Sequence, residues 1–190
     1  MTNPRPVGPH LNPSDADLQA SDGDSAAVEK GEPQAVYGTD RSAARLAAVQ
    51  ALYQMDLAHT DLNVVLGEFT DHRFGSLVEE TPISEADPDV FALLVRGVMA
   101  NQREIDPMVD GQLATGWRLA RIDSILRAML RAGAFELLKR DDVPAKVVIN
   151  EYIDMAHQFF DGDEAKVVNG VLDKLAHRLR PNELTSAGHG

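Results

Sequence analysis

From residue 40 onward, the apolar residues of this chain recur at steps of three and four, which is the repeat of an α-helix. The sequence shows no convincing run of the alternating apolar and polar residues that mark a half-buried β-strand. The pattern therefore predicts an all-α fold. Its clearest apolar stripe lies on one face of a predicted helix and consists of Leu119, Ile122, Ile125, Leu126, Met129, Leu130, Gly133 and Leu137.

The breaks between the periodic segments predict a single-domain bundle of about seven helices. Thr39 or Asp40 is expected to cap the first helix, and Pro181 is expected to end the last. Asp106 followed by Pro107 is typical of a helix start, with the acid as N-cap and the proline at the first helical position. We expect the helices near residues 40–58, 62–69, 91–99, 107–115, 119–137, 145–159 and 163–180.

The first 38 residues differ in composition from the rest of the chain. They hold five of the ten prolines and few large apolar side chains, so they cannot bury enough surface to offset the entropy of ordering. We predict a disordered acidic tail over residues 1–38, a helical domain over 39–181 and a flexible C-terminal tail over 182–190. The acidic tail is either a dispensable extension or a segment that shields the protein or binds a partner.

The chain lacks the residue patterns that most catalytic and metal sites need. It has no cysteine, which excludes disulfides, thiolate metal sites and cysteine nucleophiles. None of its six histidines forms the i, i+4 pair of a zinc peptidase, and no glycine-rich phosphate loop occurs. We therefore expect a binding protein that has no catalytic residue, no metal site and no other cofactor.

Membrane insertion and export are not expected either. No apolar run approaches the roughly 18 residues that a membrane span requires. The first 30 residues contain no apolar stretch that could form the core of a signal peptide. The sequence thus predicts a cytoplasmic protein without a membrane partner.

The basic residues indicate a binding function. Arg41 and Arg45 lie four residues apart, on one face of the first predicted helix near its start, and Gln50 follows on the same helix. The helix dipole opposes arginine at this end, and such a cost is tolerated more readily where the side chain contacts phosphate. An ordinary solvated helix face is the alternative interpretation.

Other polar and aromatic residues leave both structural and functional interpretations open. Asp163, just before the last helix, is expected to be its N-cap and could also make a surface contact. Tyr53 and Trp117 are expected to pack in or at the rim of the core rather than to stack on bases. Four arginines either pair with acids of the same chain or form a second binding surface: Arg118, Arg121, Arg127 and Arg131.

Four blocks of sequence resemble, in order, the bacterial transcription antitermination factors of the NusB family. They span the chain from about Arg41 to Pro181. Each block is moderately specific, and their common order adds weight to the resemblance. The blocks are ARLAAVQALYQ at 44–54, RIDSILRAMLRAGAFELL at 121–138, DVPAKVVINE at 142–151 and VNGVLDK at 168–174.

The resemblance implies an all-α protein without cofactor that pairs with the ribosomal protein NusE. The pair would bind the boxA segment of nascent RNA and help RNA polymerase read through terminators in ribosomal RNA operons. The family's RNA contacts at the start of the first helix carry over to Arg41 and Arg45, and an acidic position before the last helix carries over to Asp163. We add Gln50 to this RNA-binding set because it offers hydrogen bonds on the first helix.

This chain departs from the family pattern in ways that affect RNA binding. Ser42, Ala43 and Ala44 stand where the family often has further arginines, and Phe160 stands where glycine is usual. Fewer arginines predict weaker stand-alone affinity and a shallower salt dependence. Since the formal net charge is −12, we expect specific RNA binding to require the basic partner NusE.

Two other functions fit parts of the sequence. A NusB-like domain also precedes the catalytic domain of some RNA cytosine methyltransferases, but this chain ends at Gly190 without a cysteine, so we do not expect that activity. A NusB-like protein-assembly module with little RNA binding of its own is favoured by the thinned arginine cluster. The sequence leaves monomer and homodimer both open.

Overall fold

The computed structural model describes residues 40–74 and 85–185, and every regular element in these two ranges is helical. The predicted N-terminal tail, the capping role of Thr39 and residues 186–190 lie outside the described residues. The all-α fold class is confirmed, and the described residues form seven α-helices. The elements are α1 (Asp40–Ala58), α2 (Leu62–Glu68), a π-helical turn η1 (Phe69–Arg73), α3 (Pro88–Asp110), a 3₁₀ turn η2 (Leu119–Arg121), α4 (Ser124–Lys139), α5 (Ala145–Phe159), α6 (Glu164–Leu179) and α7 (Pro181–Thr185).

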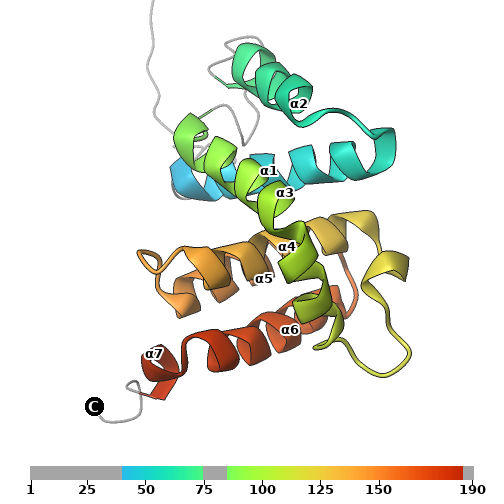
Figure 1. Cartoon of the computed structure of the whole chain (residues 1–190), viewed down its shortest axis with the longest axis vertical. Coiled ribbons are helices and arrows are strands. Elements are labelled where there is room, and N and C mark those ends of the chain that lie inside the picture. Colours follow the sequence, from blue (N-terminus) through green and yellow to red (C-terminus); the bar gives the residue numbers. More distant parts are fainter. Residues whose placement is uncertain (1–39, 75–84, 186–190) are drawn as a thin grey trace, which may run out of the picture. The chain divides into compact units, whose positions relative to one another are not determined.

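The helix α4 is the centre of the helical core. It packs against α1 and α3 on one side and against α5 and α6 on the other. In Figure 1, α1 and α2 occupy the upper part of the view and α6 and α7 the lower part, while α3 runs from the upper part down to the level of α6. Ten of the sixteen residues of α4 are buried, because neighbours cover it on most sides. The apolar stripe identified in the sequence thus forms the core that places the remaining helices.

A glycine on α3 allows that helix to approach α4 closely. A Cβ atom at Gly97 would lie only 2.0 Å from the ring of Phe135 on α4. No side chain larger than hydrogen fits there without displacing this buried ring. Gly97 therefore sets the spacing between the two helices.

The structure corrects the predicted helix start at Asp106–Pro107. Helix α3 runs without interruption to Asp110, so Pro107 lies inside its last turns. Proline is tolerated there because only one backbone hydrogen bond is lost near the helix end. Asp106 does not cap a helix, because its carboxylate accepts hydrogen bonds from Arg131 at 2.8 Å. The actual cap of α3 is Asp87, which accepts from the backbone N–H groups of residues 89 and 90.

Two further predicted boundaries differ from the structure. The stripe from 119 to 137 is not one helix, since α4 begins only after Asp123, whose carboxylate accepts from the N–H groups of Ile125 and Leu126. Pro181 follows the end of α6, as predicted, but it also begins the short helix α7. In the described residues the count of seven is right, but two predicted segments form the single helix α3, and α7 was not predicted. Among the described helices, none is both long and apolar enough to cross a membrane.

Candidate functional site

Helix α1 carries three of the four residues that the sequence singled out, and it is an unusually buried helix. Eight consecutive residues, from 42 to 49, are buried. Arg41 lies just before this run and is exposed. The hydrogen bonds from Arg140 are the main cause of the lowered pKa of Asp142, in the turn between α4 and α5, and the charge of Arg41 makes a smaller contribution.

Arg45 does not share the surface with Arg41, contrary to the prediction. Only 3% of Arg45 is exposed. Its Nε and Nη2 donate to the two carboxylate oxygens of Glu136 on α4, at 2.9 and 2.8 Å. Its Nη1 lies 3.8 Å from the carboxylate of Glu151 on α5, and the neighbouring residues of α1 are buried as well. In this structure the guanidinium of Arg45 is therefore not available to a phosphate.

The buried ion pair belongs to a larger network that joins α1, α4 and α5. The hydroxyl of Tyr152 donates to Glu136 Oε1 at 2.8 Å, and that of Ser42 donates to Glu151 Oε1 at 2.9 Å. Complete burial and the charge of Glu136 hold the pKa of Tyr152 well above its ordinary value, so this hydroxyl stays protonated as a donor. The network fixes the first turns of α1, which carry Arg41, to the rest of the core.

Gln50 lies on a different side of α1 from Arg41. The two residues are nine positions apart, which corresponds to about half a turn around the helix axis. Gln50 lines a groove of about 400 Å³ together with Tyr53, Gln54 and Arg73. The guanidinium carbon of Arg73 lies 4.4 Å from the ring centre of Phe69 in η1, which holds this cation beside the groove.

The groove between α1 and η1 has the chemistry to receive an unpaired base. Tyr53 is half-buried and offers a ring face, and Gln50 offers amide hydrogen bonds. Arg73 brings a positive charge that is partly offset by its ion pair with Glu68, at 3.2 Å. Gln54 is already engaged, because its Nε2 donates to Glu68 at 2.8 Å. Sequence reasoning missed Tyr53 and Arg73 as site residues, since the segment containing Arg73 meets α1 only through the tertiary fold.

Asp163 stands at the N-cap position of α6 but does not cap it through its side chain. Its carboxylate instead accepts a hydrogen bond from Lys166 Nζ at 2.6 Å, and both side chains are exposed. This bond and the charge of Lys166 lower the pKa of Asp163. The predicted capping role is therefore wrong, because the lysine one turn later takes the carboxylate. Contact of Asp163 with RNA stays a prediction.

The structure does not bring the four predicted residues to one place. Ser42, beside Arg41, contacts Glu151 in the middle of α5, whereas Asp163 follows the end of α5. About 12 Å of helix separates Glu151 from that end. An extended ligand such as single-stranded RNA could contact both ends, but a small molecule could not.

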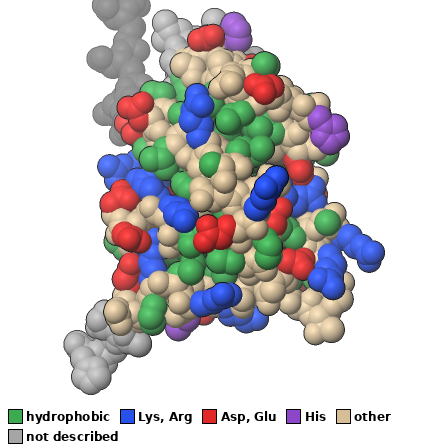
Figure 2. Space-filling model, viewed as in Figure 1, with side chains coloured by type: hydrophobic (Ala, Val, Ile, Leu, Met, Phe, Trp, Pro, Cys, Tyr) green, Lys and Arg blue, Asp and Glu red, His purple; other side chains and the backbone are tan. Residues whose placement is uncertain are grey.

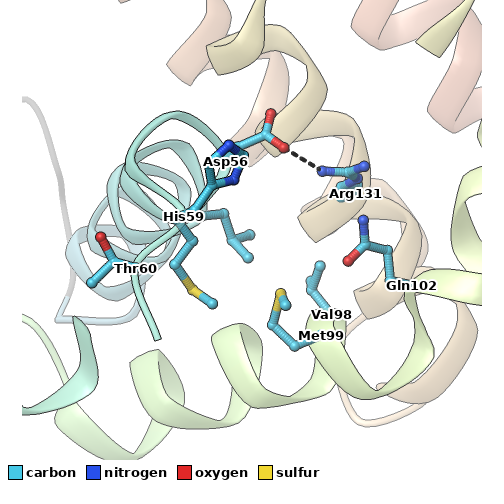
Figure 3. Close-up of a pocket in the computed structure, with 9 residues that line it drawn as sticks. Asp56, His59, Thr60, Val98, Met99, Gln102 and Arg131 are labelled. Atoms are coloured by element: carbon cyan, nitrogen blue, oxygen red, sulfur yellow. Dashed lines mark ion pairs between the residues drawn. The ribbon is translucent and has the colours of Figure 1, made fainter. Parts of the chain in front are cut away.

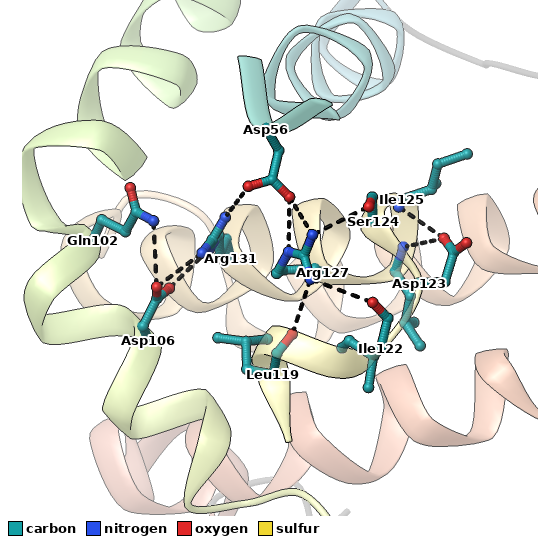
Figure 4. Close-up of polar contacts among 11 residues, drawn as sticks. Asp56, Gln102, Asp106, Leu119, Ile122, Asp123, Ser124, Ile125, Arg127 and Arg131 are labelled. Carbon is teal, nitrogen blue, oxygen red and sulfur yellow. Dashed lines mark hydrogen bonds and ion pairs between the residues drawn. The ribbon is translucent and has the colours of Figure 1, made fainter. Parts of the chain in front are cut away.

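The four arginines around the start of α4 are mostly paired within the chain. Arg118 binds Asp110. Arg127 binds Asp56 and Arg131 binds Asp106 (Figure 4). Arg121 is exposed. Of the two interpretations left open by the sequence, intramolecular pairing thus describes three of the four. Figure 2 shows the same tendency on one face of the molecule, where Lys and Arg side chains alternate with Asp and Glu.

Trp117 is the most conspicuous aromatic residue at the surface, with 45% of it exposed. It lies in the loop between α3 and η2, between two hollows of about 230 and 340 Å³. The first hollow is mainly apolar and reaches Val167 and Val171 of α6. The second includes Arg121 and Glu164, and one carboxylate oxygen of Glu164 is buried without a hydrogen-bond partner in the described residues.

A third cleft of about 290 Å³ lies between the end of α1, α3 and α4. The ion pair between Asp56 and Arg131 lies along one side, and Val98 and Met99 of α3 line the side that faces it (Figure 3). His59, directly after α1, has a positive φ of 52°. Within residues 40–74 and 85–185, no three His, Asp or Glu side chains gather closely enough to hold a metal ion.

Comparison with known proteins gives consistent matches. The model of the NusB family matches residues 42–177. The transcription antitermination protein NusB of Rhodopseudomonas palustris strain HaA2 is 49% identical over 158 residues, which cover 83% of this chain and 92% of that protein. The protein of the same name from Caulobacter vibrioides is 52% identical over 140 residues, covering 74% of this chain and 94% of the relative.

Solved structures show the same likeness in three dimensions. The T. maritima NusB structure superposes with a TM-score of 0.64 at 29% identity and covers 77% of this chain and 98% of its own. A structure of antitermination factors NusB and NusE in complex with double-stranded RNA matches with a TM-score of 0.61 at 22% identity, covering 73% and 97%. At this identity, the last match shows only that the two proteins share a fold.

Proposed function

Because the chain belongs to the NusB family of transcription antitermination proteins, we propose that it binds boxA RNA together with the ribosomal protein NusE. The complex would promote read-through by RNA polymerase in ribosomal RNA operons, in the cytoplasm. The chain is thus a non-enzymatic factor. The observation that carries the proposal is the family match over residues 42–177, which covers α1 from Ser42 onward and begins directly after Arg41.

The charge of the chain supports a shared RNA site. RNA binding depends on cations that neutralise phosphates, but this chain has a net charge of −12 and buries Arg45 in an ion pair. Arg41 and the groove around Gln50, Tyr53 and Arg73 are the RNA contacts that this chain still offers. A basic partner such as a ribosomal protein would supply the missing positive charge.

The loop around Trp117 is the surface that we assign to NusE. An exposed tryptophan beside an apolar hollow is the kind of anchor that protein interfaces use. Arg121 and Glu164 line the neighbouring hollow, so charged side chains lie beside this anchor.

The decisive experiment is a titration of boxA RNA with the full chain alone and with the chain plus NusE, at one fixed salt concentration. We expect tight binding only with NusE, and weaker binding to an RNA of scrambled sequence. Equally tight binding without NusE would contradict the need for the partner. A second measurement compares NusE binding by Trp117→Ala with that by Val64→Ala, an exposed apolar control on α2. Equal affinities would contradict the docking surface.

An alternative function is a protein-assembly module with little RNA binding of its own. The burial of Arg45 favours it, because the expected pair of phosphate contacts at the start of α1 is reduced to Arg41. In that case the chain would bind NusE, but the boxA titration would show no gain in RNA affinity over NusE alone. The same experiment therefore separates the two functions.

A further inference from the structure

Arg127, in the first turns of α4, uses all of its guanidinium nitrogens. Nε donates to Asp56 Oδ2 at 2.8 Å, and Nη2 contacts the same oxygen and Ser124 Oγ. Nη1 donates to the backbone carbonyls of Leu119 and Ile122, at 3.2 and 3.3 Å (Figure 4). One side chain therefore joins three segments: the last turns of α1, the start of α4 and the turn η2.

The backbone of Leu119 is held from both sides. Its N–H donates to Asp110 Oδ1 at the end of α3, at 2.8 Å, while its carbonyl accepts from Arg127. The other oxygen of Asp110 accepts from Arg118 at 2.9 Å. The hydrogen bond from Leu119 is the main reason that the pKa of Asp110 is lowered, so the carboxylate is charged at neutral pH. These contacts close the loop of residues 111–118, and Trp117 is displayed on that loop.

We propose that Arg127 is a positioning residue for the NusE-docking loop, and that it fixes this loop relative to α1, the helix that contacts RNA. The proposal rests on the proposed function, because it assigns a role in partner binding. The planar guanidinium is essential to it, since five donors in a fixed geometry reach a carboxylate and two carbonyls at once. A lysine at this position could pair with Asp56 but could not also hold both carbonyls.

Arg131 provides a matched control one helical turn later. Its side chain is 14% exposed, as is that of Arg127, and its Nη1 lies 3.5 Å from the same residue, Asp56. Its remaining bonds go to Asp106 on α3. Unlike Arg127, it makes no hydrogen bond to the backbone carbonyls of Leu119 and Ile122. The two arginines thus differ in the contact that the proposal concerns.

The experiment compares Arg127→Lys with Arg131→Lys in the full chain. Trp117 is the single tryptophan of the sequence, so acrylamide quenching of its fluorescence reports on the loop directly. We expect both variants to lose similar stability in urea, but only Arg127→Lys to raise the quenching of Trp117. NusE affinity should fall about tenfold in Arg127→Lys and remain near the wild-type value in Arg131→Lys.

Two results would overturn the proposal: equal quenching and NusE affinity in both variants, or unchanged values in Arg127→Lys. If Arg127→Lys does not fold, Asp110→Ala releases the Leu119 N–H from the opposite side and should raise Trp117 quenching in the same way, and unchanged quenching there would also overturn it. Failure of the wild-type chain to bind NusE would contradict the proposed function instead, and the quenching comparison would still test whether Arg127 holds the loop.

Discussion

Arg45 and Glu136, 91 residues apart in sequence, form a two-point ion pair in the core between α1 and α4. Glu136 is fully buried, so its charge is separated from water and depends on this partner. Its Oε1 also accepts from Tyr152, which brings α5 into the same contact. Arg45, which the sequence assigned to RNA binding, thus stabilises the fold. Arg41, one turn earlier, is the arginine that remains at the surface.

Removing the charge of Glu136 should destabilise the protein strongly. In Glu136→Gln the guanidinium of Arg45 loses the carboxylate that binds it at two points and keeps only that of Glu151, at 3.8 Å, so we expect the unfolding free energy to fall by about 3 kcal/mol. The measurement is equilibrium unfolding in urea at neutral pH. The triple variant Arg45→Met, Glu136→Met, Tyr152→Phe replaces the ion pair and the hydroxyl that donates to it by apolar side chains. It should recover most of the lost unfolding free energy. A combined variant that is no more stable than Glu136→Gln would contradict this account.

Periodicity was sufficient for the fold class and for the central role of the 119–137 stripe, because apolar spacing is a local property of the sequence. Helix ends that depend on distant partners were not predictable in the same way. Asp106 has the local signature of an N-cap, yet Arg131, 25 residues later, takes its carboxylate. Asp163 is likewise taken by Lys166. In both cases a side-chain partner replaced the backbone groups that a local rule assigns.

The candidate site was predictable only in part. Arg41 is exposed as expected, but Arg45 is surrounded by the buried residues Ala44 and Leu46. The alanines and other apolar residues that flank Arg45 between positions 43 and 49 are a local signal of burial. The groove around Gln50 could not be found from sequence, because Arg73 reaches it through the packing of η1 beside α1.

Arg180 should be essential for stability although it lies near the end of the helical domain. It is buried, and it donates to the backbone carbonyls of Leu137 and Val143 at 2.8 and 2.6 Å, and also to those of residues 136 and 140. It thereby binds the end of α4 and the turn that follows to the end of α6, where the carbonyls of residues 136 and 140 also accept backbone N–H groups. We expect Arg180→Met to lower the unfolding free energy by more than about 3 kcal/mol.

The control for Arg180 is Arg178→Met, two residues earlier on the exposed side of α6. Its stability in urea should stay within about 0.5 kcal/mol of the wild-type value. Similar losses in the two variants would mean that the general loss of positive charge, rather than the carbonyl contacts of Arg180, is responsible.

The turn between α4 and α5 should lose a stabilising contact in acid. Hydrogen bonds from Arg140, at 2.8 and 2.7 Å, hold the pKa of Asp142 at about 2, below its ordinary value of 3.8. Because the folded-state pKa is the lower one, the contribution is present above pH 3.8 and disappears as the pH falls toward 2. Since Asp142 is largely exposed, Asp142→Asn should cost less than about 1 kcal/mol at pH 7.

Urea unfolding of the wild type and Asp142→Asn at pH 7, 4, 3 and 2 measures this effect at low ionic strength. The stability difference between the two proteins should be constant from pH 7 to about pH 5 and should shrink between pH 4 and 2. A difference that persists unchanged at pH 2 would show that Asp142 acts through its shape or its backbone hydrogen bonds and not through its charge.

Arg41 should contribute to RNA affinity without contributing to stability. It is exposed at the start of α1, so Arg41→Ala should change the unfolding free energy by less than about 0.5 kcal/mol. If it contacts a phosphate, its loss should reduce the slope of log affinity against log salt concentration by about one. The measurement is boxA binding by the complex with NusE at several salt concentrations.

The control is Arg103→Ala, which removes an arginine that is likewise exposed, on α3. It should leave the slope unchanged, because the reduction comes from a specific contact and not from net charge. Equal slopes in the wild type and Arg41→Ala would remove the start of α1 from the RNA-binding surface.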